Sequence, residues 1–205
     1  MPDRWFVARH GETVFNAVGR IQGDAPHTPL TRAGFAQAEK MGEALRARLG
    51  ARPDVKLWSS TAGRALQTLA VIAEHLELDW HDARTDGRLG EIGMGEWGGR
   101  YYRDLGPVLD PATHLFTRPA PGGEWYDGIA RRLQDWIDDT RDERGDRIVL
   151  MHGMSSRVLR GMLIGAEARP EWGAPVAPSL PQGSVAEVGD GSETVLCSGS
   201  GGERS

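Results

Sequence analysis

The chain contains little cysteine, no long apolar run and no excess of positive charge. Its single cysteine, Cys197, excludes an internal disulfide, so we expect a reducing, cytoplasmic setting. No run of about eighteen apolar residues exists and residues 1–20 hold no apolar signal core, which predicts no membrane span. The net charge of −5 gives no overall basic field, so neither nucleic acid nor an anionic membrane is an expected partner.

The residues that are present suit one globular domain. A length of 205 residues allows a full hydrophobic core, and the 39% apolar and 26% charged fractions are ordinary. We expect a single domain over residues 1–198, with a small inserted cap at about 92–123 and a flexible tail at 199–205. Residues 86–123 are rich in Gly and Pro, which favours loops and a short helix there.

Apolar periodicity predicts alternating strands and helices. Strands are expected at 4–8, 55–59, 79–83 and 147–151, with a closing hairpin of 185–188 and 194–197 around Gly189-Asp190-Gly191. Helices are expected at 33–49 with Thr31 as N-cap, at 62–76, at 124–144, and from Ser155 or Ser156 to Ile164, while 16–31 is expected to be a loop. This order predicts an α/β fold: a three-layer sandwich around a mainly parallel sheet, with helices on both faces and antiparallel strands at one edge.

Two of the predicted strands end in a His-Gly pair. The segment VARHGET at 7–13 ends a strand in His10-Gly11, and IVLMHGM at 148–154 ends another in His152-Gly153. In open α/β sheets, ligands bind at the carboxyl ends of the strands, where the Ser59-Ser60 turn is also expected. Three separate segments are therefore predicted to meet at one crevice.

Further motifs accompany the two His-Gly pairs. In chain order they are RHGET at 9–13, Asn16, GRIQG at 19–23, PLT at 29–31, Gly34, QA at 37–38, SS at 59–60, RALQT at 64–68, LGEIGMGEWGG at 89–99, PGGE at 121–124 and HG at 152–153. RHG alone would be a weak signal, but the ordered set spans about residues 4–155. With these motifs the chain resembles the histidine phosphatase superfamily, in its phosphoglycerate mutase-like branch.

The resemblance implies a site for phosphoryl transfer. His10 would be the nucleophile, and a phosphohistidine intermediate would divide one difficult displacement into two easier ones. Arg9, Arg64 and His152 would surround the phosphoryl group and stabilise the charge on its oxygens. Arginine suits this role because its planar guanidinium makes bidentate contacts to phosphate.

The remaining implied residues act beside these cations. Glu91 would donate a proton to the leaving oxygen and then activate water, which requires a raised pKa. Asn16, Gln22 and Gly23 would add neutral hydrogen bonds to the phosphate, and Gly153 belongs to the same phosphate-binding set. No metal and no cofactor is expected, because side chains supply the positive charge.

Simpler roles stay open for several of these residues. His152 also fits a supporting position behind the site, and Arg64 fits a solvated position at the start of a helix. Either Glu96 or Glu124 could be the acid in place of Glu91.

The sequence departs from the family pattern in two places. His27 stands where relatives commonly have an aspartate before PLT, in a loop that is slightly long. The segment GMGEWGGRYYRDL at 93–105 lacks the mutase-type ERHYG signature. Specificity is therefore least predictable at the 22–31 loop and at the cap.

Three functions are compatible with these observations. The leading hypothesis is a phosphomonoesterase that acts on a small phosphorylated metabolite. The second is a phosphoglycerate mutase-type reaction, in which Arg100 and Arg103 could bind a carboxylate. The third is a catalytically inert phospholigand-binding domain. The sequence does not identify the substrate, and a homodimer is only a base-rate expectation.

Overall fold

The computed structural model describes residues 4–200. The strands are β1 (Trp5–Arg9), β2 (Val55–Ser59), β3 (Arg84–Thr85), β4 (Asp146–Met151), β5 (Val185–Gly189) and β6 (Ser192–Cys197). The α-helices are α1 (Val14–Ala17), α2 (Arg32–Leu49), α3 (Gly63–Leu76), α4 (Tyr126–Asp139) and α5 (Gly153–Leu163). Short 3₁₀ helices lie at Trp80–Asp82, Gly87–Leu89, Gly95–Trp97 and Tyr102–Asp104.

The strands form one six-stranded sheet in the order β3-β2-β4-β1-β5-β6. The pairs β3–β2, β2–β4 and β4–β1 are parallel, whereas β1–β5 and β5–β6 are antiparallel. The predicted α/β fold, with a mainly parallel sheet and an antiparallel edge pair, is confirmed. Because β1, β2 and β4 are parallel neighbours, their carboxyl ends meet at the same edge of the sheet.

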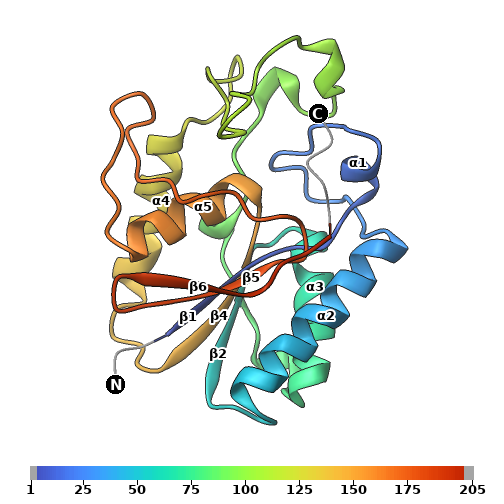
Figure 1. The fold of residues 1–205 in the computed structure, drawn as a ribbon, viewed down its shortest axis with the longest axis vertical. Coiled ribbons are helices and arrows are strands. Elements are labelled where there is room, and N and C mark those ends of the chain that lie inside the picture. Colours follow the sequence, from blue (N-terminus) through green and yellow to red (C-terminus); the bar gives the residue numbers. More distant parts are fainter. Residues whose placement is uncertain (1–3, 201–205) are drawn as a thin grey trace.

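Different helices cover the two faces of the sheet. Along β1, Phe6 and Ala8 belong to one apolar core and Val7 to the other, because successive side chains of a strand point to opposite faces. The core around Phe6 includes residues of α2 and α3, and the core around Val7 includes residues of α4 and α5. Figure 1 shows these helix pairs on opposite sides of the sheet, which gives the three layers.

The segment predicted as a cap lies beyond the carboxyl ends of the strands (Figure 1, green, at the top). It contains two short 3₁₀ helices, Gly95–Trp97 and Tyr102–Asp104, joined by irregular backbone. The Tyr126 hydroxyl accepts a hydrogen bond from the Phe116 main-chain N–H at 2.8 Å, so the start of α4 holds this segment over the site.

Two predicted elements were wrong in type or extent. Residues 79–83 are not a strand: Asp79 accepts a hydrogen bond from the His81 N–H and begins a 3₁₀ helix, and only Arg84–Thr85 pairs with β2. The helix predicted at 124–144 covers Tyr126–Asp139. Its extension is prevented by the Arg147 guanidinium, which donates to the carbonyls of Thr140 and Glu143 and draws the chain into a turn.

Smaller differences concern where helices and strands begin. Helix α1 occupies the start of the predicted loop, because Thr13 and Asn16 form a reciprocal capping box. Thr31 caps α2 as predicted, accepting from the Gly34 N–H at 3.0 Å. Strands β5 and β6 each extend toward the turn, which is left with Asp190 and Gly191.

The chain after β6 is hydrogen-bonded to the residue that precedes β5. The Gly199 N–H donates to the Ser184 hydroxyl at 2.9 Å. Most of the predicted tail, 201–205, lies outside the described residues. Within residues 4–200, no helix combines the length and the apolar character that a membrane span requires.

Candidate active site at the strand ends

His10 follows directly after β1 and is 2% exposed. Its Nδ1 lies 2.7 Å from the Gly11 carbonyl oxygen, and because a carbonyl can only accept, Nδ1 carries the proton. The other ring nitrogen, Nε2, is therefore unprotonated. Burial, followed by the positive charge of Arg64, holds the pKa of His10 well below its usual value. The ring is thus a neutral base with a free lone pair on Nε2.

Arg64, at the start of α3, is fully buried beside this lone pair. Its Nε–H points between two acceptors, His10 Nε2 and His152 Nδ1, each at 3.2 Å. Burial lowers the Arg64 pKa to about 10, so the side chain stays a cation at neutral pH. The predicted cation therefore lies in direct contact with the predicted nucleophile.

The 22–31 loop holds the far end of Arg64. The terminal nitrogens donate to the carbonyls of Gly23 and Ala25, at 2.7 and 2.6 Å, and to the Thr28 hydroxyl at 3.0 Å. Gly23 adopts a left-handed φ of +48°, and a Cβ there would lie 2.5 Å from the Met94 side chain. His27 itself is exposed, and the loop residues that hold Arg64 are its neighbours Gly23, Ala25 and Thr28.

His152 precedes α5 and is completely buried. Since Nδ1 accepts the Arg64 Nε–H, the proton lies on Nε2, which donates to the Ser60 hydroxyl at 2.8 Å. Burial and then Arg64 place the His152 pKa well below its usual value. The His10 and His152 ring centroids are 5.2 Å apart. Ser60 was not among the predicted site residues, although its position after β2 was a usable signal.

The Glu91 side chain caps the amino end of α5. Its carboxylate accepts from the main-chain N–H groups of Met154 and Ser155, with distances of 3.0 to 3.1 Å, and from that of Ile92 at 3.0 Å. A carboxylate at a helix amino terminus satisfies unpaired N–H groups and interacts favourably with the helix dipole. This long-range cap explains why α5 begins at Gly153, earlier than predicted.

Of the three acids considered, only Glu91 lines the cavity that contains His10. Glu96 is exposed, and Glu124 forms an ion pair with Arg132 at 2.8 Å. The three main-chain donors stabilise the Glu91 anion, whereas a proton donor must be protonated.

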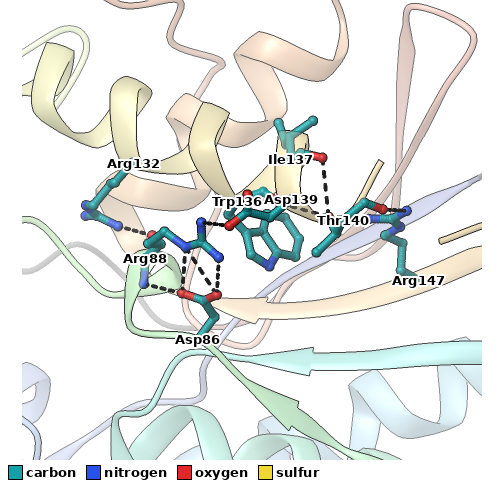
Figure 2. Close-up of polar contacts among 8 residues, drawn as sticks. All are labelled: Asp86, Arg88, Arg132, Trp136, Ile137, Asp139, Thr140 and Arg147. Carbon is teal, nitrogen blue, oxygen red and sulfur yellow. Dashed lines mark hydrogen bonds and ion pairs between the residues drawn. The ribbon is translucent and has the colours of Figure 1, made fainter. Parts of the chain in front are cut away.

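A polar network holds the segment before Glu91 against α4 (Figure 2). Arg88 forms ion pairs with Asp86 at 2.7 Å and with Asp139 at 2.6 Å. Hydrogen bonds to Arg88 lower the pKa of the Asp86 carboxyl. Arg132, also on α4, donates to the carbonyls of Arg88 and Glu91. These contacts fix the main chain on either side of Gly90.

Arg9 and Gly153 form another side of the site. One terminal nitrogen of Arg9 donates to the Leu180 carbonyl at 2.6 Å. A Cβ on Gly153 would lie 3.2 Å from Arg9 Nη2 and 3.3 Å from Glu91 Oε2. Glycine at this position therefore lets the cation and the carboxylate approach the start of α5 together.

Neutral side chains complete the predicted set. Gln22 Nε2 lies 3.5 Å from His10 Nε2, and its Oε1 lies 2.8 Å from the Thr13 hydroxyl. Asn16 Oδ1 accepts from the Thr13 N–H at 3.1 Å. The amide groups of Asn16 and Gln22 thus border the same space as His10.

Two adjoining cavities follow from this arrangement. A small one of about 60 Å³ is lined by His10, Glu91 and the neutral side chains. A larger one of about 510 Å³ lies under the cap and shares Arg9 and Arg20 with the small one. Arg103 lines the large cavity. Arg100 is exposed and lines neither of them.

Comparisons by sequence find similar proteins of known family. A family model for the histidine phosphatase superfamily (branch 1) matches residues 5–195. The chain is 31% identical over 173 residues to the probable phosphoglycerate mutase GpmB of Yersinia pestis (strain Pestoides F), covering 81% of this chain and 77% of that protein.

Solved structures share the fold. The mycobacterial glucosyl-3-phosphoglycerate phosphatase complexed with VO3 has a TM-score of 0.76 at 23% identity, over 94% of this chain and 96% of that one. A candidate α-ribazole-5′-phosphate phosphatase from Escherichia coli K-12 has a TM-score of 0.72 at 24% identity, over 98% and 97% of the two chains. The family match extends over nearly the whole chain, and the protein belongs to the histidine phosphatase superfamily, branch 1.

Proposed function

We propose that the protein is a phosphomonoesterase that hydrolyses a small phosphorylated metabolite through a phosphohistidine on His10. The observation that carries the proposal is the unprotonated Nε2 of His10, which borders a small cavity and lies 3.2 Å from the Arg64 Nε. A neutral imidazole whose Nε2 carries no proton can attack phosphorus without first losing one.

In the first step, His10 Nε2 forms a bond to phosphorus while the bond from phosphorus to the leaving oxygen breaks. The leaving oxygen takes a proton from Glu91. The lone pair that accepted the Arg64 Nε–H is now used in the N–P bond, so this N–H group is released to a phosphoryl oxygen. Arg9 and Arg64 stabilise the charge that spreads over the phosphoryl oxygens in the transition state.

In the second step, Glu91 takes a proton from water as the water oxygen attacks phosphorus. The N–P bond breaks, its electron pair returns to Nε2, and inorganic phosphate leaves. The three main-chain donors on Glu91 suit this second, basic role. For the first step, the same carboxyl group lines the small cavity beside His10.

Five further residues complete the proposed site: His152, Asn16, Gln22, Gly23 and Gly153. His152 holds the Arg64 Nε–H from the side opposite His10, and Ser60 fixes its ring. The amides of Asn16 and Gln22 offer donors to phosphate, and the two glycines leave room for the cations. The positive charge comes from side chains, so we propose that the reaction needs no metal.

A phosphoglycerate mutase-type reaction is the second candidate. The identity of 31% to the probable mutase GpmB of Yersinia pestis favours it. Against it, Arg100, one of the two cations expected to bind the carboxylate, lines neither cavity next to His10. A mutase would convert 3-phosphoglycerate to 2-phosphoglycerate and release little phosphate.

The test is turnover of p-nitrophenyl phosphate, glycerol 3-phosphate and 3-phosphoglycerate in the presence of EDTA. We expect phosphate release by the wild type and release at background level by His10→Ala. The matched control is His81→Ala, since His81 is exposed and outside the site.

The other outcomes each contradict part of the proposal. Isomerisation of 3-phosphoglycerate without phosphate release would favour the mutase. Loss of turnover in EDTA that added metal restores would refute the metal-free mechanism. Binding of phosphate without turnover of any ester would favour an inert phospholigand-binding domain.

A further inference from the structure

Arg20 lines both the small cavity that contains His10 and the large cavity under the cap. Its main chain is held rigidly to the cap. The N–H of its neighbour Ile21 donates to the Arg100 carbonyl at 2.8 Å, and the Gly99 N–H donates to the Ile21 carbonyl at 2.8 Å. Arg20 and Tyr101 form an antiparallel β-bridge. The residue therefore occupies a fixed place between the two spaces.

The guanidinium of Arg20 is held on three sides. Its Cζ lies 4.9 Å from the Phe15 ring centroid and 5.2 Å from the Tyr101 ring centroid, and Nε donates to the Gly99 carbonyl at 2.7 Å. These contacts use a single donor. Within residues 4–200, the two terminal nitrogens of Arg20 have no hydrogen-bond or ion-pair partner. The outer edge of a half-buried, pre-positioned guanidinium is thus available to an anion.

Of the other charged groups around the large cavity, two already make hydrogen bonds and one is largely exposed. Arg9 donates to the Leu180 carbonyl. Arg103 is 76% exposed and lies 3.8 Å from Asp104. The Asp110 carboxylate accepts from two main-chain N–H groups and from the Thr113 hydroxyl, at 2.7 to 3.1 Å. Arg20 is therefore the cation of this cavity whose paired N–H edge is best placed to meet a ligand.

Geometry also relates Arg20 to the phosphoryl site. An anion bound on Arg20 lies in the space that adjoins the His10 cavity, so it can belong to the same molecule whose phosphoryl group contacts His10. A volume of about 510 Å³ is within the range of pockets that enclose metabolite-sized ligands. A fork of two N–H groups matches a carboxylate or a phosphate, and does not match a neutral hydroxyl as well.

We propose that Arg20 determines specificity by binding a second anionic group, a carboxylate or a phosphate, on the leaving group of the substrate. This inference rests on the proposed phosphomonoesterase activity. It narrows the substrate class to phosphomonoesters that carry at least one further negative charge.

Two matched substrate pairs test the proposal. The first is 3-phosphoglycerate against glycerol 3-phosphate, which differ by a carboxylate, and the second is fructose 1,6-bisphosphate against fructose 6-phosphate. We expect the wild type to prefer, in at least one pair, the member that carries the second anionic group. In Arg20→Gln this preference falls about 10- to 100-fold, mainly through KM, as expected for the loss of charge-assisted hydrogen bonds. The pair that responds identifies the anion as carboxylate or phosphate.

Two further variants separate anion binding from a structural role. Arg20→Lys keeps the charge and should restore part of the preference, whereas Arg100→Gln, at an exposed position outside the cavities, should keep it fully. Equal losses on both members of each pair in Arg20→Gln would show that Arg20 only clamps the cap, and would overturn the proposal. A wild type with no preference in either pair would also overturn it.

Failure of the proposed activity gives a different result. Turnover of p-nitrophenyl phosphate by the wild type tests that activity without a second anion. If this turnover is absent, calorimetric binding of the same substrate pairs to the wild type and to Arg20→Gln still tests Arg20. The proposal is supported if the wild type binds the member with the second anionic group more tightly and Arg20→Gln loses this difference. It is refuted if the difference in binding is the same in both proteins.

Discussion

The phosphoryl end of the site and the cap end differ in how they are built. Around His10, three parallel strands end side by side, and Arg64 alone makes five hydrogen bonds to three segments of the chain. Around the large cavity, most of the walls come from the irregular backbone of the cap. The comparison teaches that the proposed chemistry rests on regular structure, while the proposed selection of the leaving group rests on irregular segments, which can vary without disturbing the sheet.

Removing the acid should have the largest effect on the phosphoryl end. We expect Glu91→Gln to lower kcat/KM, which reports the first step alone, about 10²- to 10⁴-fold on glycerol 3-phosphate, because its alkoxide leaving group needs a proton. The effect on p-nitrophenyl phosphate should be much smaller, since p-nitrophenolate leaves without one. Steady-state kinetics on both esters measure the difference. Equal losses on the two esters would contradict a proton-donor role for Glu91.

Loosening the cap should affect stability more than chemistry. In Tyr126→Phe the buried N–H of Phe116 loses its acceptor, and we expect the free energy of unfolding to fall by about 1–3 kcal/mol. Turnover of p-nitrophenyl phosphate should stay near the wild-type value. Urea unfolding, with the m-value checked for constancy, gives the stability. A clear loss of turnover under conditions in which the variant is still folded would mean that the two ends of the site are not independent.

The smallest expected effect is a loss of stability at acid pH, caused by the buried histidines of the phosphoryl end. Since burial and Arg64 lower the pKa values of His10 and His152 in the folded protein, the unfolded chain binds more protons below about pH 6.5. Stability is therefore complete above that pH and is lost as pH falls, by up to ~1.4 kcal/mol per histidine and pH unit. Unfolding free energies at pH 7.5, 6.5 and 5.5 measure this slope. His10→Gln should reduce the slope, and an unchanged slope would exclude His10 as a source.

Much of the fold followed from local patterns. Apolar stretches located β1, β2 and β4, and Thr31 was recognisable as a cap because its partner Gly34 is only three residues away. The strand predicted at 79–83 was wrong because an aspartate that caps a 3₁₀ turn outweighed the short apolar signal. The predicted start of α5 was wrong because a distant residue, Glu91, caps it. The predicted end of α4 was wrong because Arg147, in the next strand, holds the turn that follows the helix.

The sequence by itself determined that His10 and His152 follow strands, and it contained the motifs whose family resemblance implied roles for His10, Arg64 and His152. The tertiary structure decided how they meet. The cap that Glu91 forms on α5, the bond from His152 to Ser60 and the position of Arg20 between Phe15 and Tyr101 all join segments far apart in the chain or depend on their packing. Such contacts depend on the packing of the sheet and the cap as a whole, because no local spacing determines which distant groups a side chain will meet.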